Sequence, residues 1–338
     1  MDPLTQGALG AALAQAVPTK TKNLGVAGGL GFIAGMAADL DVLIRSSADP
    51  LLFLEYHRHF THSLAFIPVG GLLCALAIQY VLGRRWQLTF LQTFVCCTLG
   101  YGTHALLDAS TSYGTTLLWP FSEDRLSWSI VPIIDLLFTV PLVTLCVLAA
   151  LRQTRAFAWA AMLWVGIYLS LGVLQHNAAL SMAKQVATSR GHSPTRFEVK
   201  PSFANILLWK TVYETSGHFH VDAVRVGLSP EYFDGTVIPK LDVTRDLPWL
   251  DAKSQQAKDI QRFSVFSKAF VAEDHEVPNR IFDVRYSFVP NEIRPLWSVE
   301  VSPTAELDTH AAYRTHRENP RESFGRLWQM LCCSVAGE

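Results

Sequence analysis

Five apolar runs, each about 20 residues long, occupy the first half of the chain and limit what it can fold into. A helix rises about 1.5 Å per residue, so each run could cross the roughly 30 Å hydrocarbon core of a bilayer. The runs cover residues 24–44, 61–82, 88–107, 130–151 and 156–175. A shorter segment rich in alanine and glycine, residues 4–17, precedes them and could span the membrane, re-enter it or lie at its surface. The sequence therefore predicts a mainly α, polytopic membrane domain of about five or six helices.

Composition agrees with a membrane protein that carries a soluble part. Hydrophobic residues make up 50% of the chain and charged residues only 17%, whereas about a quarter of the residues in a soluble domain are charged. The net charge of -1 provides no field that would attract nucleic acid, so no direct nucleic-acid binding is expected. The six cysteines lie inside apolar runs or side by side near the end, which is not the spacing of a disulfide or zinc framework.

Basic residues in the short connections predict on which side of the membrane each loop lies. Loops rich in lysine and arginine stay in the cytoplasm. Such residues stand between alternate pairs of apolar segments, namely Lys20, Lys22, Arg84, Arg85, Arg152 and Arg155. We therefore expect residues 45–60, residues 108–129 and the chain after residue 175 to face away from the cytoplasm.

The composition changes near residue 181, where charged residues become frequent and proline and glycine separate short alternating runs. Residues 219–226, 281–289 and 296–301 are typical of strands, and residues 245–270 are typical of a helix. We predict a soluble α+β domain over residues 179–338, after a helical transmembrane domain over residues 1–178. Trp209, Trp249 and Trp297 are expected in its core, with lipid contact as the alternative.

Histidine and aspartate residues gather at corresponding ends of the apolar runs. In chain order they are Asp39, Asp41, His57, His59, His62, His104, Asp108 and Asp135. By the predicted orientation they all lie toward one face of the membrane. Ionisable groups in or near bilayer helices are costly and usually have a functional reason. Carboxylates and imidazoles bind zinc, manganese or iron, so the pattern predicts a metal centre, with room for two ions and a water that the metal activates.

Spacing along a helix supports the convergence of some of these residues. His104 and Asp108 are four positions apart and therefore share one side of a helix. His59 and His62 share a face if a helix has begun there, with Thr61 available as a cap. The pattern thus brings at least one histidine and one aspartate together.

Each of the remaining residues has an alternative explanation. Asp39 and Asp41 could cap a helix end at the interface, and His57 could be a surface residue. Asp135 could pair with Arg125 or Arg58. Arg58 itself is a candidate for binding a negatively charged substrate group, because its guanidinium matches phosphate geometry, or it could anchor the chain at the membrane surface.

An ordered set of short motifs runs through residues 1–145: MDPLTQGALGAA, GMAADLD, HRHFTHS, HALLDASTSYGT with WPFS after it, and IIDLLF. Together they resemble the membrane-bound metal-dependent hydrolase family, which includes LexA-binding inner-membrane hydrolases of bacteria. The later stretch FANILLWKTVYETSGHFHV is similar to the soluble tail of a subset of that family. The resemblance implies a helical hydrolase, embedded in the bacterial inner membrane, that holds divalent metal.

Carried over motif by motif, the resemblance implies a set of metal ligands: Asp39, Asp41, His57, His62, His104 and Asp108. Two positions depart from the family pattern. Gln6 stands where many relatives have histidine, which leaves an N-terminal ligand open, and Ala38 replaces a proline that would mainly end a helix. The implied cofactor is a divalent metal, with zinc favoured over manganese or iron.

These expectations combine into a hydrolase with its site at the periplasmic face, acting on a lipid-linked or amphiphilic ester and more specifically on a phosphoester. Asp39, Asp41 or Asp108 would orient the attacking water or move its proton, and Arg58 would neutralise charge on the leaving phosphate. Membrane lipids and a regulatory protein are the expected partners. One rival is a membrane scaffold or stress-response binding protein with a structural or vestigial metal site. A transporter is a further alternative, although the residues cluster at one face and do not line a path.

Overall fold

The computed structural model describes residues 1–18, 21, 23–86, 88–227, 229–316 and 320–332. The chain divides into two units. The first holds Met1–Leu43, Tyr56–Leu174 and Phe203–Asn205, and the second holds Ile44–Glu55, Gln175–Ser202 and Ile206–Glu338. The short segment Ile44–Glu55 therefore lies, in sequence, between parts of the first unit but belongs to the second.

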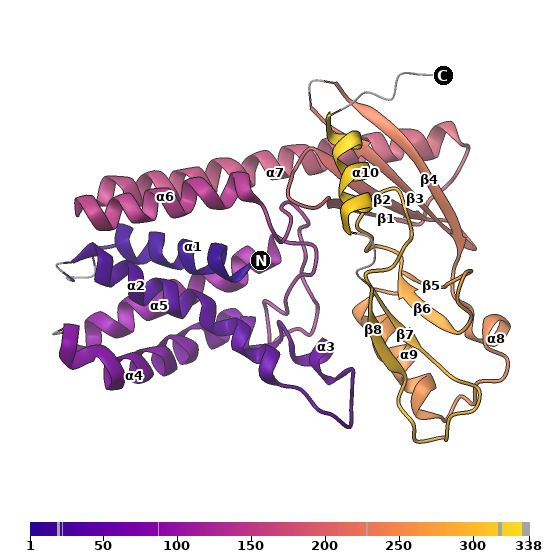
Figure 1. Ribbon diagram of the computed structural model, residues 1–338, viewed down its shortest axis with the longest axis horizontal. Coiled ribbons are helices and arrows are strands. Elements are labelled where there is room, and N and C mark those ends of the chain that lie inside the picture. Colours follow the sequence, from indigo (N-terminus) through magenta and orange to yellow (C-terminus); the bar gives the residue numbers. More distant parts are fainter. Residues whose placement is uncertain (19–20, 22, 87, 228, 317–319, 333–338) are drawn as a thin grey trace. The chain divides into compact units, whose positions relative to one another are not determined.

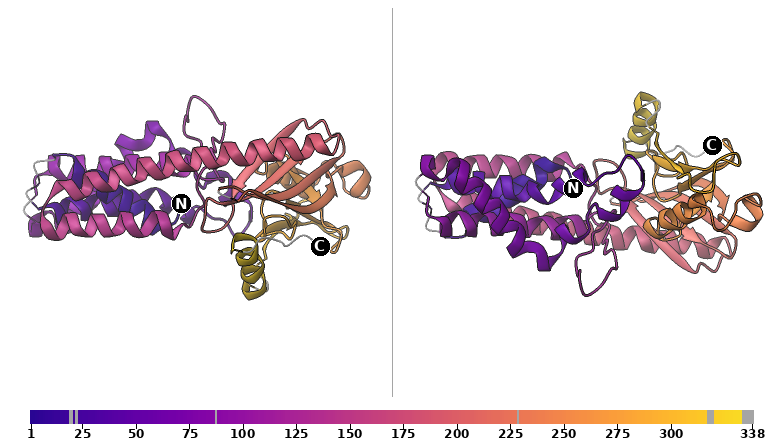
Figure 2. Two further views of the ribbon diagram at one scale, coloured as in Figure 1. Left: turned by 90° about the horizontal axis from the view of Figure 1, so that it is seen from above. Right: turned by 90° about the horizontal axis from the view of Figure 1, so that it is seen from below.

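Long helices run side by side in the first unit (Figures 1 and 2). They are α1 (Pro3–Ala16), α2 (Leu24–Ala37), α4 (Ile67–Trp86), α5 (Phe90–Ala109), α6 (Leu136–Arg152) and the first part of α7 (Arg155–Ser189). Short helical turns lie between α2 and α4: η1 (Ala38–Leu43), α3 (Leu52–Tyr56), η2 (Phe60–His62) and η3 (Leu64–Phe66). The expectation of a helical membrane region at the start of the chain is therefore confirmed in outline.

Three helical stretches among the described residues are long and apolar enough to cross a membrane: Leu24–Leu43, Leu64–Leu82 and Arg155–Ser189. Five such spans were predicted, and the prediction is wrong for the runs over residues 88–107 and 130–151. Helix α5 has the length, but the threonine, histidine and aspartate side chains that it buries make it less apolar. Helix α6 begins only at Leu136, because the side chain of Asp135 caps it by accepting the first backbone N–H groups.

Three glycines allow α1, α2 and α5 to pack backbone against backbone. A Cβ atom on Gly31 would clash with the carbonyl oxygen of Gly10, and one on Gly100 would clash with the carbonyl oxygen of Gly31. Small residues permit such close packing between helices in a bilayer, where no hydrophobic driving force acts between them. The close approach brings the end of α2 to the last turns of α5, where His104 hydrogen-bonds to the carbonyl oxygen of Gly35.

The second unit is rich in β-strands, which form two four-stranded antiparallel sheets. The first has the order β1 (Arg196–Pro201), β2 (Leu208–Glu214), β3 (His218–Arg225) and β4 (Glu231–Pro239). The second has the order β5 (Val271–Glu273), β6 (Arg280–Asp283), β7 (Trp297–Glu300) and β8 (Ala312–Thr315). Phe219 and Val221 of the first sheet share a buried core with Phe270 and Phe282, so the two sheets stabilise one another.

Short helices lie beside the sheets: α8 (Val243–Asp246), α9 (Gln255–Phe266) and α10 (Pro320–Cys332). The single helix predicted over residues 245–270 is wrong, because the chain breaks between α8 and α9. Pro248 lies in the break, where its ring could not continue a helix. Ser254 then starts α9 as its N-cap, accepting the N–H of Ala257 at 3.2 Å.

The predicted strands correspond to three of the observed ones. The strands expected over residues 219–226 and 296–301 are β3 and β7, and the strand expected over residues 281–289 ends early, at β6. Trp209 and Trp297 are buried, as predicted for core residues, whereas Trp249 is 37% exposed.

Gly31→Ala is expected to destabilise the helical unit, whereas Gly29→Ala in the same helix should not. A methyl group at position 31 would meet the α1 backbone, but no atom lies within 4 Å of one at position 29. Overpacking typically costs about 1–3 kcal/mol, while replacing glycine by alanine in a helix gains up to about 1 kcal/mol. Thermal unfolding of both variants in one detergent measures the difference. Equal melting temperatures would show that the helices do not pack this closely.

Candidate metal centre

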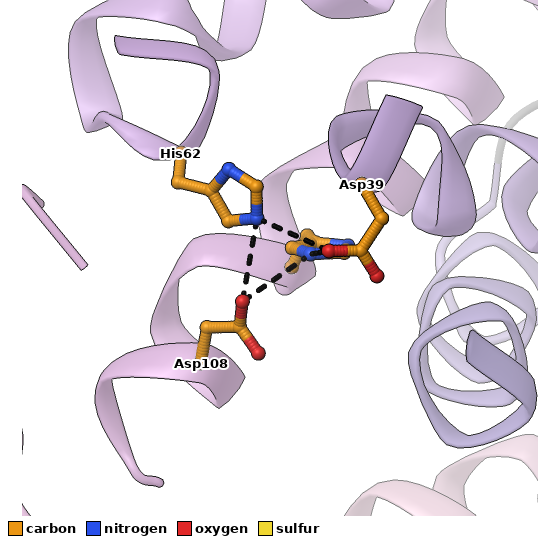
Figure 3. Close-up of side chains that lie close together, drawn as sticks. Asp39, His62 and Asp108 are labelled. Carbon is orange, nitrogen blue, oxygen red and sulfur yellow. Dashed lines mark ion pairs between the residues drawn. The ribbon is translucent and has the colours of Figure 1, made fainter. Parts of the chain in front are cut away.

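Four side chains converge near the ends of α2 and α5 (Figure 3). Asp39 comes from η1, His62 from η2, and both His104 and Asp108 from α5; their facing atoms lie within 4.8 Å of one another. Asp39 Oδ1 is 3.5 Å from His62 Nε2 and 3.4 Å from His104 Nε2. Asp108 Oδ2 is 3.3 and 3.5 Å from the same two nitrogens. Ligands at about 2.0–2.1 Å from a tetrahedral zinc ion are about 3.3–3.4 Å apart, so the spacing suits a metal ion.

Three of the four facing atoms are buried and make no hydrogen bond within the described part of the chain. They are His62 Nε2, His104 Nε2 and Asp108 Oδ2. A buried polar atom without a partner costs about 1–3 kcal/mol, so such a group needs an explanation. Each imidazole nitrogen and the carboxylate oxygen can offer a lone pair, and one cation would satisfy all three. The donor set therefore fits a divalent metal ion.

The outer nitrogens of both histidines contact oxygen atoms, and these contacts orient the inner nitrogens toward the group. His104 Nδ1 lies 2.6 Å from the carbonyl oxygen of Gly35, which can only accept, so Nδ1 donates the proton. His62 Nδ1 lies 3.1 Å from a carboxylate oxygen of Asp41. Thr61 Oγ1 donates to that same oxygen at 2.7 Å. Partners of this kind orient metal-binding histidines and select their tautomer.

Asp41 and His57, which were both predicted as ligands, lie outside the group of four. One oxygen of Asp41 is directed to His62 and the other lies 2.7 Å from His57 Nδ1. Asp41 also accepts the backbone N–H of Arg58 at 2.9 Å. The ring of His57 approaches that of His62 edge-on, with centroids 6.1 Å apart. Asp41 therefore contacts the centre through the Nδ1 side of His62, and His57 contacts Asp41 in turn.

Arg58 is buried against Asp108 and supplies a positive charge beside the group. Its Nε is 3.1 Å from Asp108 Oδ2, and its Nη1 donates to Thr111 Oγ1 at 3.1 Å. Only 5% of the residue is exposed. Its backbone has a φ of 63°, in the left-handed region, and its carbonyl accepts the N–H of Thr116 at 3.2 Å. Thr111 therefore binds the guanidinium, and Thr116 binds the backbone of the same residue.

Gln6, which stands where the family pattern has histidine, faces Asp108 from the other side. Its Nε2 donates to Asp108 Oδ1 at 2.8 Å, and the amino group of Met1 pairs with the same oxygen. Asp108 thus presents Oδ1 to the Gln6 and Met1 donors, and Oδ2 to the two histidines and to Arg58. Gln6 is therefore a hydrogen-bond donor to Asp108, which is one of the predicted metal ligands.

His59 and Asp135 do not join the group. His59 Nε2 pairs with Glu123 at 2.9 Å, and Asp135 caps α6 and accepts the hydroxyl of Tyr168 at 2.6 Å. Sequence reasoning missed Gly35 and Thr61 as supporting residues. Gly35 acts through its backbone carbonyl, which leaves no signal in the sequence, whereas Thr61 directly precedes a predicted ligand.

The fold and the site define a helical membrane protein with a buried His/Asp group that suits a metal ion. The chain belongs to the YdjM inner membrane protein family, whose model matches residues 1–179. Among curated proteins, the inner membrane protein YbcI of Escherichia coli (strain K12) is 33% identical over 108 residues, which make up 30% of this chain and 60% of that protein. The chain thus spans less than two thirds of that relative. No solved structure matches the chain significantly.

The comparisons support a location in the inner membrane, and the matched names state no activity. The orientation in the membrane stays a prediction. Lys20 and Lys22, on which it partly rests, lie outside the described residues.

His62→Ala should remove bound metal, because it deletes one of the four facing donors. His59→Ala is the matched control, since His59 belongs to the same HRHFTHS motif but pairs with Glu123. We expect near-stoichiometric zinc, manganese or iron in the wild type and in His59→Ala, and little in His62→Ala. Elemental mass spectrometry of the detergent-purified proteins measures this. Wild-type protein that stays free of metal after reconstitution with each ion would exclude the centre.

Asp41→Asn is expected to weaken metal binding without abolishing it. Asparagine keeps the shape of the side chain but loses the charge that holds His62 Nδ1–H. Removing an outer partner of a metal-binding histidine typically lowers metal affinity about 10–100-fold. Competition with a chelator of known affinity measures the change. Loss of all metal, as expected for His62→Ala, would instead make Asp41 a ligand.

Proposed function

We propose that this chain is a metal-dependent hydrolase of the inner membrane, with its site at the periplasmic face, acting on a lipid-linked or amphiphilic ester and more specifically on a phosphoester. The observation that carries the proposal is the group of two imidazoles and two carboxylates, three of whose facing atoms are buried without a hydrogen-bond partner among the described residues. Such a set fits zinc, with manganese or iron as alternatives. A divalent ion held there would polarise an ester oxygen and lower the pKa of a water molecule.

Asp39 is the proposed general base. Its side chain is 22% exposed, whereas the side chains of His62 and Asp108 are fully buried. Its Oδ1 faces the two histidines, so the carboxylate borders both the centre and the outside. A carboxylate in this position can orient an attacking water and accept its proton.

Asp108 is assigned to holding the metal and Arg58 to electrostatic stabilisation. Arg58, the Met1 amino group and the Gln6 amide all lie against the carboxylate of Asp108, and they favour its charged form. The side chain of Arg58 is too buried to bind a substrate group directly. Its positive charge nevertheless lies beside the group, where it would stabilise negative charge that develops on a phosphoester.

The surroundings of Asp39 support an amphiphilic substrate. Leu40 and Leu43, which share η1 with Asp39, are 63% and 73% exposed. Exposed leucines next to a reactive carboxylate suit a ligand that has an apolar chain and a polar ester group. In a protein of the inner membrane, such ligands are available as lipids and lipid-linked intermediates.

A non-catalytic scaffold with a structural metal site is the second candidate. Structural metal sites are closed by protein ligands, and the full burial of His62, His104 and Asp108 favours this alternative. The exposure of Asp39 favours catalysis, because a catalytic centre keeps an open position. Transport is disfavoured, because the four residues form one group and do not line a path along the helices.

Asp39→Asn should abolish most hydrolysis at saturating metal, because an amide cannot accept the proton from water. General-base removal typically lowers kcat about 10²–10⁴-fold. The assay uses the metal-loaded full chain in mixed micelles with phosphomonoesters, phosphodiesters and carboxylic esters, each with and without an acyl chain. Metal content is measured in the same samples. Asp124→Asn, which changes an exposed loop aspartate, is the control.

Folded, metal-loaded wild-type protein that hydrolyses none of these classes would make the scaffold the better proposal. Hydrolysis that survives in Asp39→Asn would still show an enzyme, but it would rule out Asp39 as the general base. A preference for substrates with an acyl chain is the expected result, and equal rates with water-soluble esters would contradict the amphiphilic substrate.

A further inference from the structure

The segment Ile44–Glu55 joins two parts of the candidate metal centre but belongs to the second unit. It follows η1, which carries Asp39 and Asp41, and it ends two residues before His57. Its Leu51 and Leu54 are buried, so the segment is packed and not a free loop. Whatever holds this segment therefore restrains the chain on both sides of it.

One arginine of α9 holds the segment through a network of carboxylates. The guanidinium of Arg262 binds Asp49 with two nitrogens, at 3.1 and 2.8 Å, and binds Glu55 through Nε at 2.5 Å. A bidentate arginine–carboxylate pair is among the stronger and more directional polar contacts. Partial burial raises the pKa of Asp49, but the hydrogen bonds from Arg262 outweigh it and lower the pKa below its usual value.

The guanidinium of Arg262 is itself held by a further carboxylate on the same helix. Its Nη1 lies 3.0 Å from Asp259, one turn earlier on α9, and Asp259 is fully buried. The other oxygen of Asp259 accepts from His310 Nδ1 and from the backbone N–H of Ala311, each at 2.9 Å. An edge contact between Phe53 and Tyr313, with centroids 5.0 Å apart, adds an apolar attachment. The segment is therefore held at several points by α9 and β8.

We propose that Arg262 is a positioning residue for the metal centre. By holding Ile44–Glu55, it limits the positions that Asp39 on one side and His62 on the other can adopt, and so raises metal affinity. Sites of this kind bind well only when an outer layer of contacts holds the ligands in place. The inference rests on the proposed metal centre, and it gives the second unit a role in setting the affinity of that centre.

The test compares Arg262→Gln with Arg280→Gln in the full chain in detergent. Arg280 is a matched control, because it lies in the same unit, pairs with Asp274 and Glu300, and has a side-chain exposure of 21% against 22% for Arg262. Zinc affinity is measured by chelator competition, and hydrogen–deuterium exchange is followed over residues 44–55. We expect Arg262→Gln to bind zinc about tenfold more weakly and to exchange faster in this segment. Arg280→Gln should match the wild type in both.

Further variants keep the inference testable if Arg262→Gln fails to fold. Arg262→Lys keeps the positive charge but cannot form the bidentate contact, so it should have an intermediate zinc affinity. Asp49→Asn should weaken zinc binding similarly, and combining it with Arg262→Gln should add little. Wild-type zinc affinity in Arg262→Gln would overturn the inference and leave the metal centre intact. A wild type that binds no metal would overturn both.

Discussion

The helical unit is organised around two carboxylates and two imidazoles that face one another, and three of these four side chains are fully buried. Burying a charged group is unfavourable unless it is paired, and two facing carboxylates repel each other. Arg58 and the Met1 amino group offset the charge of Asp108, but they lie on its far side or beside it. Within the described part of the chain, the ion pairs of Asp39 are with the two histidines. A cation at the centre would resolve this imbalance, and the hydrogen bonds behind both histidines direct their lone pairs to that place.

The sequence predicts part of this group well, and the reasons are local. His104 and Asp108 are one helical turn apart on a helix that does form, so the spacing rule holds. Asp39 and Asp41 were treated alike, yet they lie in a 3-10 turn. Positions two apart are directed to different sides of an α-helix and of a 3-10 helix alike, so one aspartate can face the centre and the other the back of His62. The two-residue spacing alone therefore favours only one of them facing a single ion, whichever type of helix forms.

The HRHFTHS motif shows a second limit. His59 and His62 would share a face of a regular α-helix, but the helical turn covers only Phe60–His62 and His59 precedes it. Its side chain is therefore directed to Glu123 and not to the centre. The number of spans was overestimated for a related reason. Helix α5 carries ligands and the polar residues that accompany them, and these make it less apolar than a lipid-facing helix of the same length.

The second unit illustrates what a family match leaves open. The match covers residues 1–179, yet Ile44–Glu55 lies within it and is held by α9 and β8, which lie beyond it. The Escherichia coli relative is about half as long as this chain, since the same aligned residues make up 60% of it and 30% of this chain. It has little room for a second unit of this size. In this chain, residues that the family model does not cover thus contact the segment between the candidate ligands.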